Sequence, residues 1–247
     1  MTRSRVRSGR EMSSPAASPR RGPAAARGEA RPDPGHGHGH SPEAGLPTDQ
    51  RLILAAERLF AERGIDAVSL RSVMAEAGAN VASVHYHFGS KDALVDALIS
   101  HRSEQLHTRR AELLDAVEAG GAPDARALAD AFVRPVGELA AAGGTPWIRL
   151  VAGIMSGNHP ALTKLTEGFA PQALRFNALL EQIAPGVAAR TLRFRLTQAM
   201  NLTFQTLGDP DGLRGMLALS GTRLSPDELL TELIDTVTAI LTGPPDR

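Results

Sequence analysis

The stretch GANVASVHYHFGSKDAL, residues 78–94, decides the fold of this chain. It holds Tyr86, the only tyrosine among 247 residues, between two histidines, although Phe, Trp and Tyr make up only 4% of the sequence. Residues two apart on a helix do not face each other, so these histidines are poorly placed to share a metal ion. Val84 and Phe88 already define an apolar face, although a buried Tyr86 stays an alternative. The run therefore favours a recognition surface.

Two short helices are expected here, one directly before this stretch and one within it. Ser69 is placed to cap a helix over residues 70–77, and Gly78 to end it. After a short turn, a second helix is expected over residues 81–88, ending before Gly89. Two short helices joined by a glycine-containing turn are typical of the helix-turn-helix motif, whose second helix lies in the major groove of DNA. The stretch therefore predicts DNA binding.

The chain from Thr48 onward has the periodicity of helices separated by turn residues. Apolar residues recur at three- and four-residue spacing up to Gly64, and a long helix is expected after Ser90. Ser225 with Glu228 forms a capping-box pattern for the last helix. No alternating strand pattern or Asn-Gly hairpin signal occurs, so the sequence predicts an all-α fold.

Two prolines fall inside segments that otherwise have helical periodicity. Pro135 lies near the middle of residues 124–144, and Pro171 lies within residues 160–186. A proline inside a helix removes one backbone hydrogen bond and clashes with the preceding turn. We therefore expect a kink or a break at Pro135 and an interruption of the helix at Pro171.

Residues 1–46 form a compositionally distinct arm. They include six Pro and seven Gly and carry eight Arg against four acidic residues, whereas the other 201 residues hold 19 basic and 23 acidic ones. Such a segment buries too little apolar surface to offset its ordering entropy, so it is expected to be disordered. Its charge suggests contact with a polyanion. Its HGHGH tract, residues 36–40, fits a solvated low-complexity segment better than a loose metal site.

The composition also limits where the protein acts. No apolar run reaches the ~18 residues of a membrane helix, and no apolar stretch follows the Arg-rich start as in a secretory signal. With no Cys, the chain has no disulfide and no Cys-based zinc site. We expect a soluble cytoplasmic protein that associates with the nucleoid and not with a membrane.

Residues 48–102 resemble the DNA-binding domain of the tetracycline-repressor (TetR) family of bacterial transcription regulators. The resemblance rests on LFAERG, on Ser69, on AEAG, on the Y-x-F pair in HYHF and on GSKDAL. It implies a homodimer in which each protomer inserts its third helix into one half-site of an imperfect palindrome in double-stranded DNA. Many members have Gly in place of Ala82 and Tyr in place of His85, so the base preference of a relative does not transfer.

The resemblance implies two kinds of DNA contact. Phosphate contacts are expected from Thr48, Ser69, Ser83, Tyr86, His87 and Lys91. Base-edge contacts are expected from Ala82 and His85, with Asn80 and Val81 at the near edge. Residues 48–102 hold six basic and seven acidic residues, so binding depends on local placement of cations and helix termini.

The domains are expected to be the arm (1–46), the helix-turn-helix domain (47–107) and an effector-binding and dimerisation domain (108–247). Large apolar side chains of the last domain allow a cavity for a small apolar or amphipathic ligand. Its candidate lining residues are Phe132, Trp147, Met155, Phe169, Phe176, Met200 and Phe204. Val187–Leu207 and Pro226–Leu241 are candidate dimer helices, unless both only close the core of the monomer.

The expected function is sequence-specific transcriptional regulation, with a repressor that its lipophilic ligand releases from the operator. Repression rests on the resemblance, and a ligand-dependent activator stays open. So does a non-specific or architectural DNA-binding protein that uses the Arg-rich arm. No nucleophile elbow, P-loop, H-E-x-x-H or dinucleotide fingerprint occurs, so no enzyme activity, catalytic residue, cofactor or metal site is expected.

Overall fold

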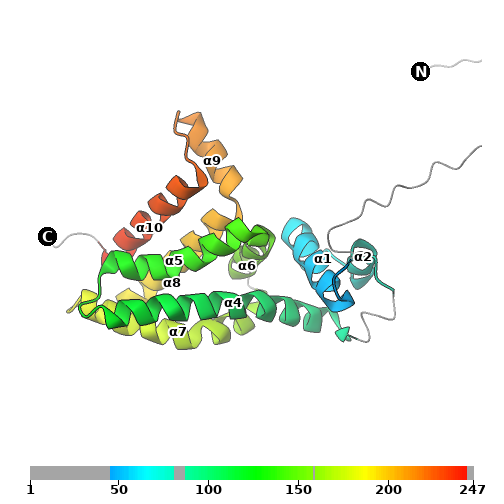
Figure 1. Cartoon of the computed structure of the whole chain (residues 1–247), viewed down its shortest axis with the longest axis horizontal. Coiled ribbons are helices and arrows are strands. Elements are labelled where there is room, and N and C mark those ends of the chain that lie inside the picture. Colours follow the sequence, from blue (N-terminus) through cyan, green and yellow to red (C-terminus); the bar gives the residue numbers. More distant parts are fainter. Residues whose placement is uncertain (1–44, 81–86, 158, 244–247) are drawn as a thin grey trace, which may run out of the picture. The chain divides into compact units, whose positions relative to one another are not determined.

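All regular structure in the described residues is helical, which confirms the all-α prediction (Figure 1). The computed structural model describes residues 45–80, 87–157 and 159–243. The helices are α1 (Thr48–Arg63), α2 (Leu70–Glu76), α4 (Lys91–Ala119), α5 (Ala125–Leu139), α6 (Thr145–Gly157), α7 (Ala161–Ile183), α8 (Ala189–Gly208), α9 (Pro210–Leu219) and α10 (Pro226–Thr242). Most of the expected helix at 81–88 lies outside the described residues. None of the described helices has the length and apolar character that crossing a bilayer requires.

The helix boundaries follow the capping residues that the sequence indicates. The Ser69 hydroxyl accepts a hydrogen bond from the Ser72 backbone N–H at 3.1 Å at the start of α2. Ser90 accepts from the Ala93 N–H at 3.1 Å at the start of α4. The predicted capping box is present at the start of α10. Each cap satisfies an N–H group that has no partner inside its helix, so these predictions are confirmed.

Of the kink or break expected at Pro135, the break is wrong. Helix α5 continues through this buried proline, because its apolar face packs closely against α10 and the packing outweighs the lost hydrogen bond. The chain instead kinks at Gly143, in the short π-helical segment Ala140–Gly144, where φ is 85°. Only glycine adopts such a φ at no steric cost.

The expected interruption at Pro171 is also wrong. Helix α7 runs without a break through this residue. Pro171 and Glu167, four residues earlier, are both exposed. Water can therefore bind the Glu167 carbonyl that the proline leaves without a donor.

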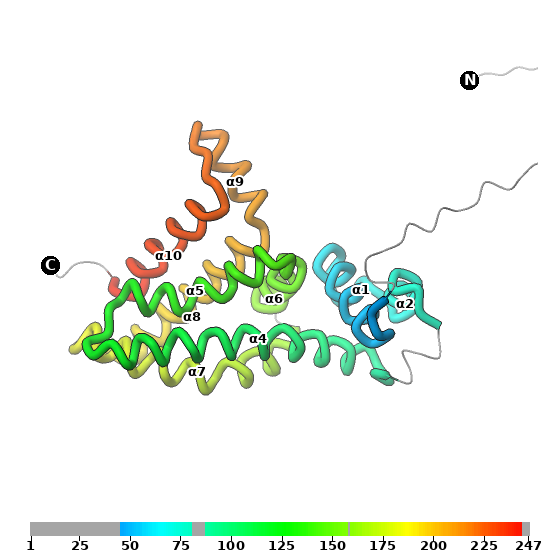
Figure 2. The backbone as a smooth tube through the Cα atoms, in the orientation of Figure 1, coloured from blue at the N-terminus to red at the C-terminus, as the bar shows by residue number. Residues whose placement is uncertain are grey.

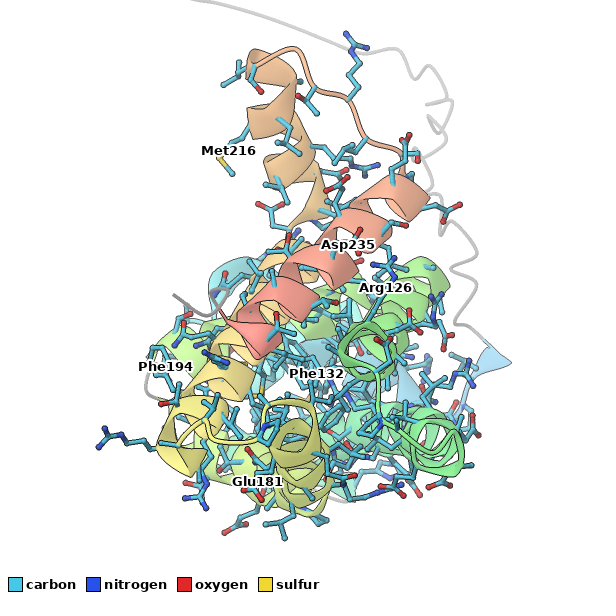
Figure 3. All side chains as sticks on the ribbon, turned by 90° about the vertical axis from the view of Figure 1, so that its left-hand side faces the viewer. Arg126, Phe132, Glu181, Phe194, Met216 and Asp235 are labelled. Carbon is cyan, nitrogen blue, oxygen red and sulfur yellow. The ribbon has the colours of Figure 1, made fainter. Side chains whose placement is uncertain are left out.

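Helix α9 is an element that the sequence prediction missed. Asp209 accepts a hydrogen bond from the Gly212 N–H at 3.2 Å, and Pro210 is the first helical residue. This pair is a helix-start signal. No residue of α9 is buried, and the Met216 side chain points away from the other helices (Figure 3).

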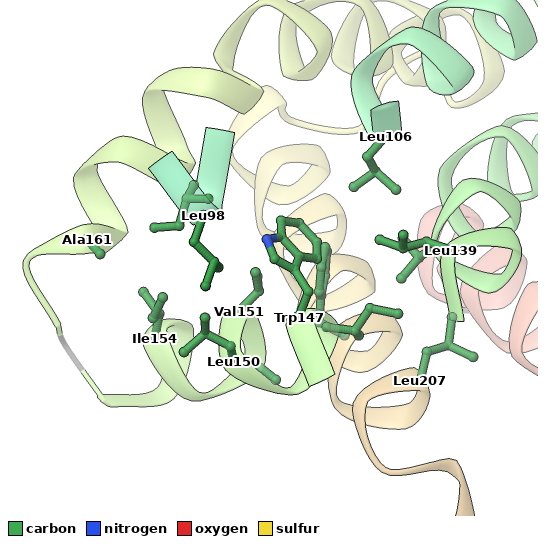
Figure 4. Close-up of a cluster of buried hydrophobic side chains, with 14 of the residues drawn as sticks. Leu98, Leu106, Leu139, Trp147, Leu150, Val151, Ile154, Ala161 and Leu207 are labelled. Atoms are coloured by element: carbon green, nitrogen blue, oxygen red, sulfur yellow. The ribbon is translucent and has the colours of Figure 1, made fainter. Parts of the chain in front are cut away.

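Two groups of helices share the core. Helices α1 and α2 pack together, and α1 also contacts α4 and α6. Helices α4, α5, α7, α8 and α10 form a bundle in which α10 packs on α5 and α8, and α6 packs on α8. Trp147 of α6 is central in the buried cluster, near Leu106 of α4 and Val151 (Figure 4). On the outside, Arg126 of α5 forms an ion pair with Asp235 of α10 (Figure 3).

Candidate DNA-binding surface and effector cavity

Helices α1 and α2 form the framework of the candidate DNA-binding surface. Arg58 of α1 and Glu76 of α2 form an exposed ion pair at 3.4 Å. Glu57 of α1 is buried, and its carboxylate accepts a hydrogen bond from Arg102 of α4 at 3.3 Å. These pairs tie the two helices to each other and to α4.

The three phosphate-contact candidates that lie inside helices or at a helix start all have polar partners. Thr48 Oγ1 accepts a hydrogen bond from Arg51 Nη2 at 3.4 Å. Ser69 is exposed at the start of α2 and shares a hydrogen bond with the Ser72 hydroxyl at 2.8 Å. Lys91 Nζ donates to the Asp66 backbone carbonyl at 3.3 Å. That bond leaves the remaining ammonium protons of Lys91 available at the first turn of α4.

Six candidates for the third helix fall at positions that the structure does not describe. Their expected contacts therefore stay predictions, and the residues are Val81, Ala82, Ser83, His85 and Tyr86, together with the apolar Val84. Asn80 and His87 flank this segment and are exposed. The turn before the segment has Gly78 at φ 58°, with Arg51 Nη1 lying 3.9 Å from where a Cβ atom of that glycine would be. The Arg51 guanidinium therefore lies close to this turn.

A cavity of about 350 Å³ lies inside the bundle, a volume typical of small-molecule sites. Side chains of α4, α6, α7 and α8 line it. Five of the seven candidate lining residues do so, namely Trp147, Met155, Phe169, Met200 and Phe204. Phe132 and Phe176 do not line the cavity. They are core residues that pack against each other edge to face, with ring centroids 5.2 Å apart.

The cavity also has a polar group that the sequence analysis missed, Arg110 of α4. Its side chain is only 2% exposed. Both Nε and Nη2 donate to the Phe132 carbonyl oxygen at 3.4 Å. The guanidinium carbon lies 4.9 Å from the ring centroid of Phe132 and 5.4 Å from that of Phe169. Burial lowers the pKa of Arg110 to about 9, so the group is still a cation at neutral pH.

A sequence signal for Arg110 was available. Leu106, Arg110 and Leu114 follow each other at four-residue spacing, and all three are buried. An arginine on the apolar stripe of a helix is rare unless it has a partner. One turn before it, burial lowers the pKa of His107, and the Arg110 charge lowers it further.

Two further polar atoms at the cavity have no hydrogen-bond partner within the described part of the chain. They are Trp147 Nε1, a donor, and Asn177 Oδ1, an acceptor. Buried polar atoms normally have a partner, so atoms of this kind mark a site where a ligand or water binds. Among the described residues, no group of three His, Cys, Asp or Glu side chains is placed to hold a metal ion.

The helix-turn-helix framework and the bundle each match a protein-family model. Residues 52–98 match the family of bacterial regulatory proteins of the tetR type, and residues 130–239 match the tetracycline-repressor-like C-terminal domain. The chain belongs to the TetR family. The resemblance seen in the sequence is thereby confirmed.

Curated relatives of this TetR-family chain are named as transcriptional regulators. It is 39% identical over 94 residues to a helix-turn-helix transcriptional repressor of Mycobacterium tuberculosis, covering 36% of this chain and 49% of that protein. It is 36% identical over 80 residues to the nicotine-responsive repressor HdnoR of Paenarthrobacter nicotinovorans, covering 32% of this chain and 39% of that protein. The match thus spans about half or less of these relatives.

Solved structures agree with the fold over most of the chain. The ketosteroid regulator KstR2 of M. tuberculosis matches with a TM-score of 0.56 at 15% identity, over 78% of this chain and 94% of that one. FadR of Bacillus subtilis, solved with stearoyl-CoA, matches with a TM-score of 0.52 at 15% identity, over 78% and 97%. At these identities the likeness shows the fold alone.

Proposed function

We propose that this protein is a homodimeric, sequence-specific transcriptional regulator, and that a small lipophilic ligand in the bundle cavity releases it from its operator. It acts on DNA in the cytoplasm and is not an enzyme. The names of relatives support a small-molecule effector, since one is nicotine-responsive, one is a ketosteroid regulator and one was solved with stearoyl-CoA. Ligand-dependent activation stays the second candidate.

The observation that carries this proposal is the continuity of α4. This single helix of 29 residues begins at Lys91, beside the DNA-binding framework (Figure 2). The same helix supplies Arg110 to the lining of the cavity. At 1.5 Å per residue, the two side chains are separated by roughly 28 Å along the helix axis. A ligand that favours one position of α4 therefore changes the placement of the DNA-contacting residues, provided that it binds the two states with different affinity.

Helix α6 is a second connection between the two sites. Trp147, Val151 and Met155 of this helix line the cavity. The same helix packs against α1, and Ile154 lies in the groove between the two. Movement of either α4 or α6 would therefore displace α1 of the DNA-binding framework, which both helices contact.

Helices α8 and α10, with α9 between them, are proposed as the dimer surface. An apolar groove follows the three helices and includes Leu202, Leu213 and Leu217. Leu217→Arg should shift the protein from dimer to monomer in sedimentation equilibrium, because a charge in the apolar core of an interface is poorly tolerated. Leu174→Arg, at an exposed leucine of α7, is the matched control. A Leu217→Arg protein that stays dimeric at every concentration would exclude this surface.

The direct test of the proposed function is fluorescence anisotropy on DNA from upstream of the protein's own gene, with scrambled DNA and Tyr86→Ala beside it at two salt concentrations. Tight binding that both changes abolish supports a specific regulator. Equal, steeply salt-dependent binding to both DNAs supports the architectural alternative instead. His85→Ala should blur base preference, and an equal loss of affinity on every sequence would contradict a base-reading role.

A further inference from the structure

The titratable side chains that line the cavity are all basic. Arg110, His107 and Arg193 contribute to its lining, and no Asp or Glu is found among the described lining residues. Most of the other lining residues are Leu, Met, Val, Ala, Phe and Trp. A cavity with an apolar body and positive charge is complementary to an amphipathic anion.

Arg110 differs from the other arginine that α4 sends into the protein. Arg102 has a buried carboxylate partner, Glu57. Arg110 is more deeply buried, yet within the described residues it bonds only to the Phe132 carbonyl oxygen and lies against aromatic rings. A buried charge is costly unless it is paired, so the missing carboxylate is the feature to explain.

The hydrogen bonds of Arg110 leave a specific edge of its guanidinium open. Nε and the inner side of Nη2 both point at the Phe132 carbonyl oxygen. The remaining N–H groups, on Nη1 and on the outer side of Nη2, form the end of the fork. That end has the spacing of the two oxygens of a carboxylate and binds them in parallel. The Trp147 Nε1–H is a second donor at the cavity without an acceptor in the described chain.

We propose that the effector of this protein is an amphipathic carboxylate, whose acid group pairs with Arg110 while its apolar body fills the cavity between α4, α6, α7 and α8. This inference rests on the proposed function, because it names the chemical class of the ligand for the same site. One buried guanidinium in a cavity lined mostly by apolar side chains matches a single negative charge. Arg193 is exposed, so it lies where solvent can screen it.

The protein carries its own reporter for the test, since Trp147 is its only tryptophan and lines the cavity. Straight-chain carboxylates from hexanoate to dodecanoate are titrated into the full-length protein, each beside the primary alcohol of the same length. We expect saturable changes in tryptophan emission, with the best carboxylate binding about tenfold to a hundredfold more tightly than its alcohol. Equal affinities, or no binding by any carboxylate, would overturn the proposal.

Three variants test which arginine causes the preference for carboxylate over alcohol. Arg110→Met should abolish the preference for carboxylate over alcohol while still admitting the alcohol, which shows that the cavity is intact. Arg110→Lys should keep part of the preference, because it retains the charge but not the fork. Arg190→Met, at an exposed arginine of α8 that does not line the cavity, is the matched control and should change affinity by no more than about twofold. A preference that persists in Arg110→Met would assign the anion site to Arg193, the other arginine of the lining, and refute the role of Arg110.

Operator DNA separates this inference from the proposed function. Carboxylate binding that leaves DNA affinity unchanged would support the ligand class and contradict ligand-controlled release. Release of DNA by the alcohol as readily as by the carboxylate would support ligand-controlled release and contradict the proposed ligand class.

Discussion

Lys91 and Arg110 are two cations of the same helix with opposite surroundings. Lys91 is at the first turn of α4, partly exposed, and makes one hydrogen bond to a backbone carbonyl. Arg110 lies farther along the helix, almost fully buried between aromatic rings. The accessible ammonium of Lys91 can bind a DNA phosphate and release its counterions. The buried guanidinium of Arg110 can instead bind one carboxylate through two parallel hydrogen bonds. The two cations have the same charge, so the difference in their burial distinguishes the two proposed ligands.

The largest expected effect tests whether the surroundings of Arg110 depend on packing. Phe176→Ala should lower the free energy of unfolding by about 3–5 kcal/mol, because it leaves a cavity beside Phe132, the ring on which Arg110 lies. Urea denaturation measures it. Phe194→Ala, at an exposed ring of α8, is the control and should change the free energy by less than about 0.5 kcal/mol (Figure 3). Similar losses in the two variants would show that the described packing does not hold.

The next effect concerns the cost of the buried charge itself. Arg110→Met should raise the free energy of unfolding of the ligand-free protein by about 1–3 kcal/mol, because it removes a buried cation that has no carboxylate partner among the described residues. Arg109→Met, one residue earlier, removes an exposed arginine that pairs with Glu112 and Glu138, and should have little effect. If Arg110→Met instead destabilises the protein strongly, Arg110 has a structural partner and the case for a ligand carboxylate fails.

Lys91→Ala tests the other member of the comparison. It should weaken operator binding about tenfold and reduce the salt dependence of binding, because a phosphate contact is lost. The binding of carboxylates should stay unchanged, just as Arg110→Met should leave DNA affinity unchanged when no ligand is present. A loss of both activities in one variant, with folding intact, would mean that the two sites are not separable.

The sequence predicted the parts of this comparison that depend on local chemistry. The caps at Ser69 and Ser90 are visible because a short side chain with an acceptor oxygen precedes a helical period. The same local reasoning failed at Pro135, because the packing of α5 on α10 is a long-range interaction that outweighs a local penalty. Helix α9 was missed because it is short and contains Gly212 and Gly215, two residues of low helix propensity, although its apolar residues recur at helical spacing.

The cavity was only partly predictable for the same reason. Aromatic and methionine side chains in several helices indicated an apolar interior, but their spacing does not tell a lining residue from a core residue. Phe169 and Phe176 are seven apart on one face of α7, yet only Phe169 reaches the cavity. The spacing of Leu106, Arg110 and Leu114 indicates that Arg110 is buried. That no acid among the described residues pairs with it is visible only in three dimensions.

The smallest expected effect concerns Glu57, the carboxylate that pairs with Arg102 of α4. Burial raises the pKa of Glu57 above its ordinary value of 4.5, and the charge and hydrogen bond of Arg102 offset part of that rise. Because the pKa is higher in the folded than in the unfolded protein, ionisation of Glu57 lowers stability as the pH rises through this range. Glu57→Gln should therefore gain stability relative to the wild type as the pH is raised from acid to neutral, in parallel urea titrations. Arg102→Met removes the offsetting charge and should show the reverse trend. A stability difference from the wild type that is independent of pH in both variants would mean that Glu57 is solvated. The pairing of Glu57 with Arg102 would then be a weaker guide to what Arg110 binds.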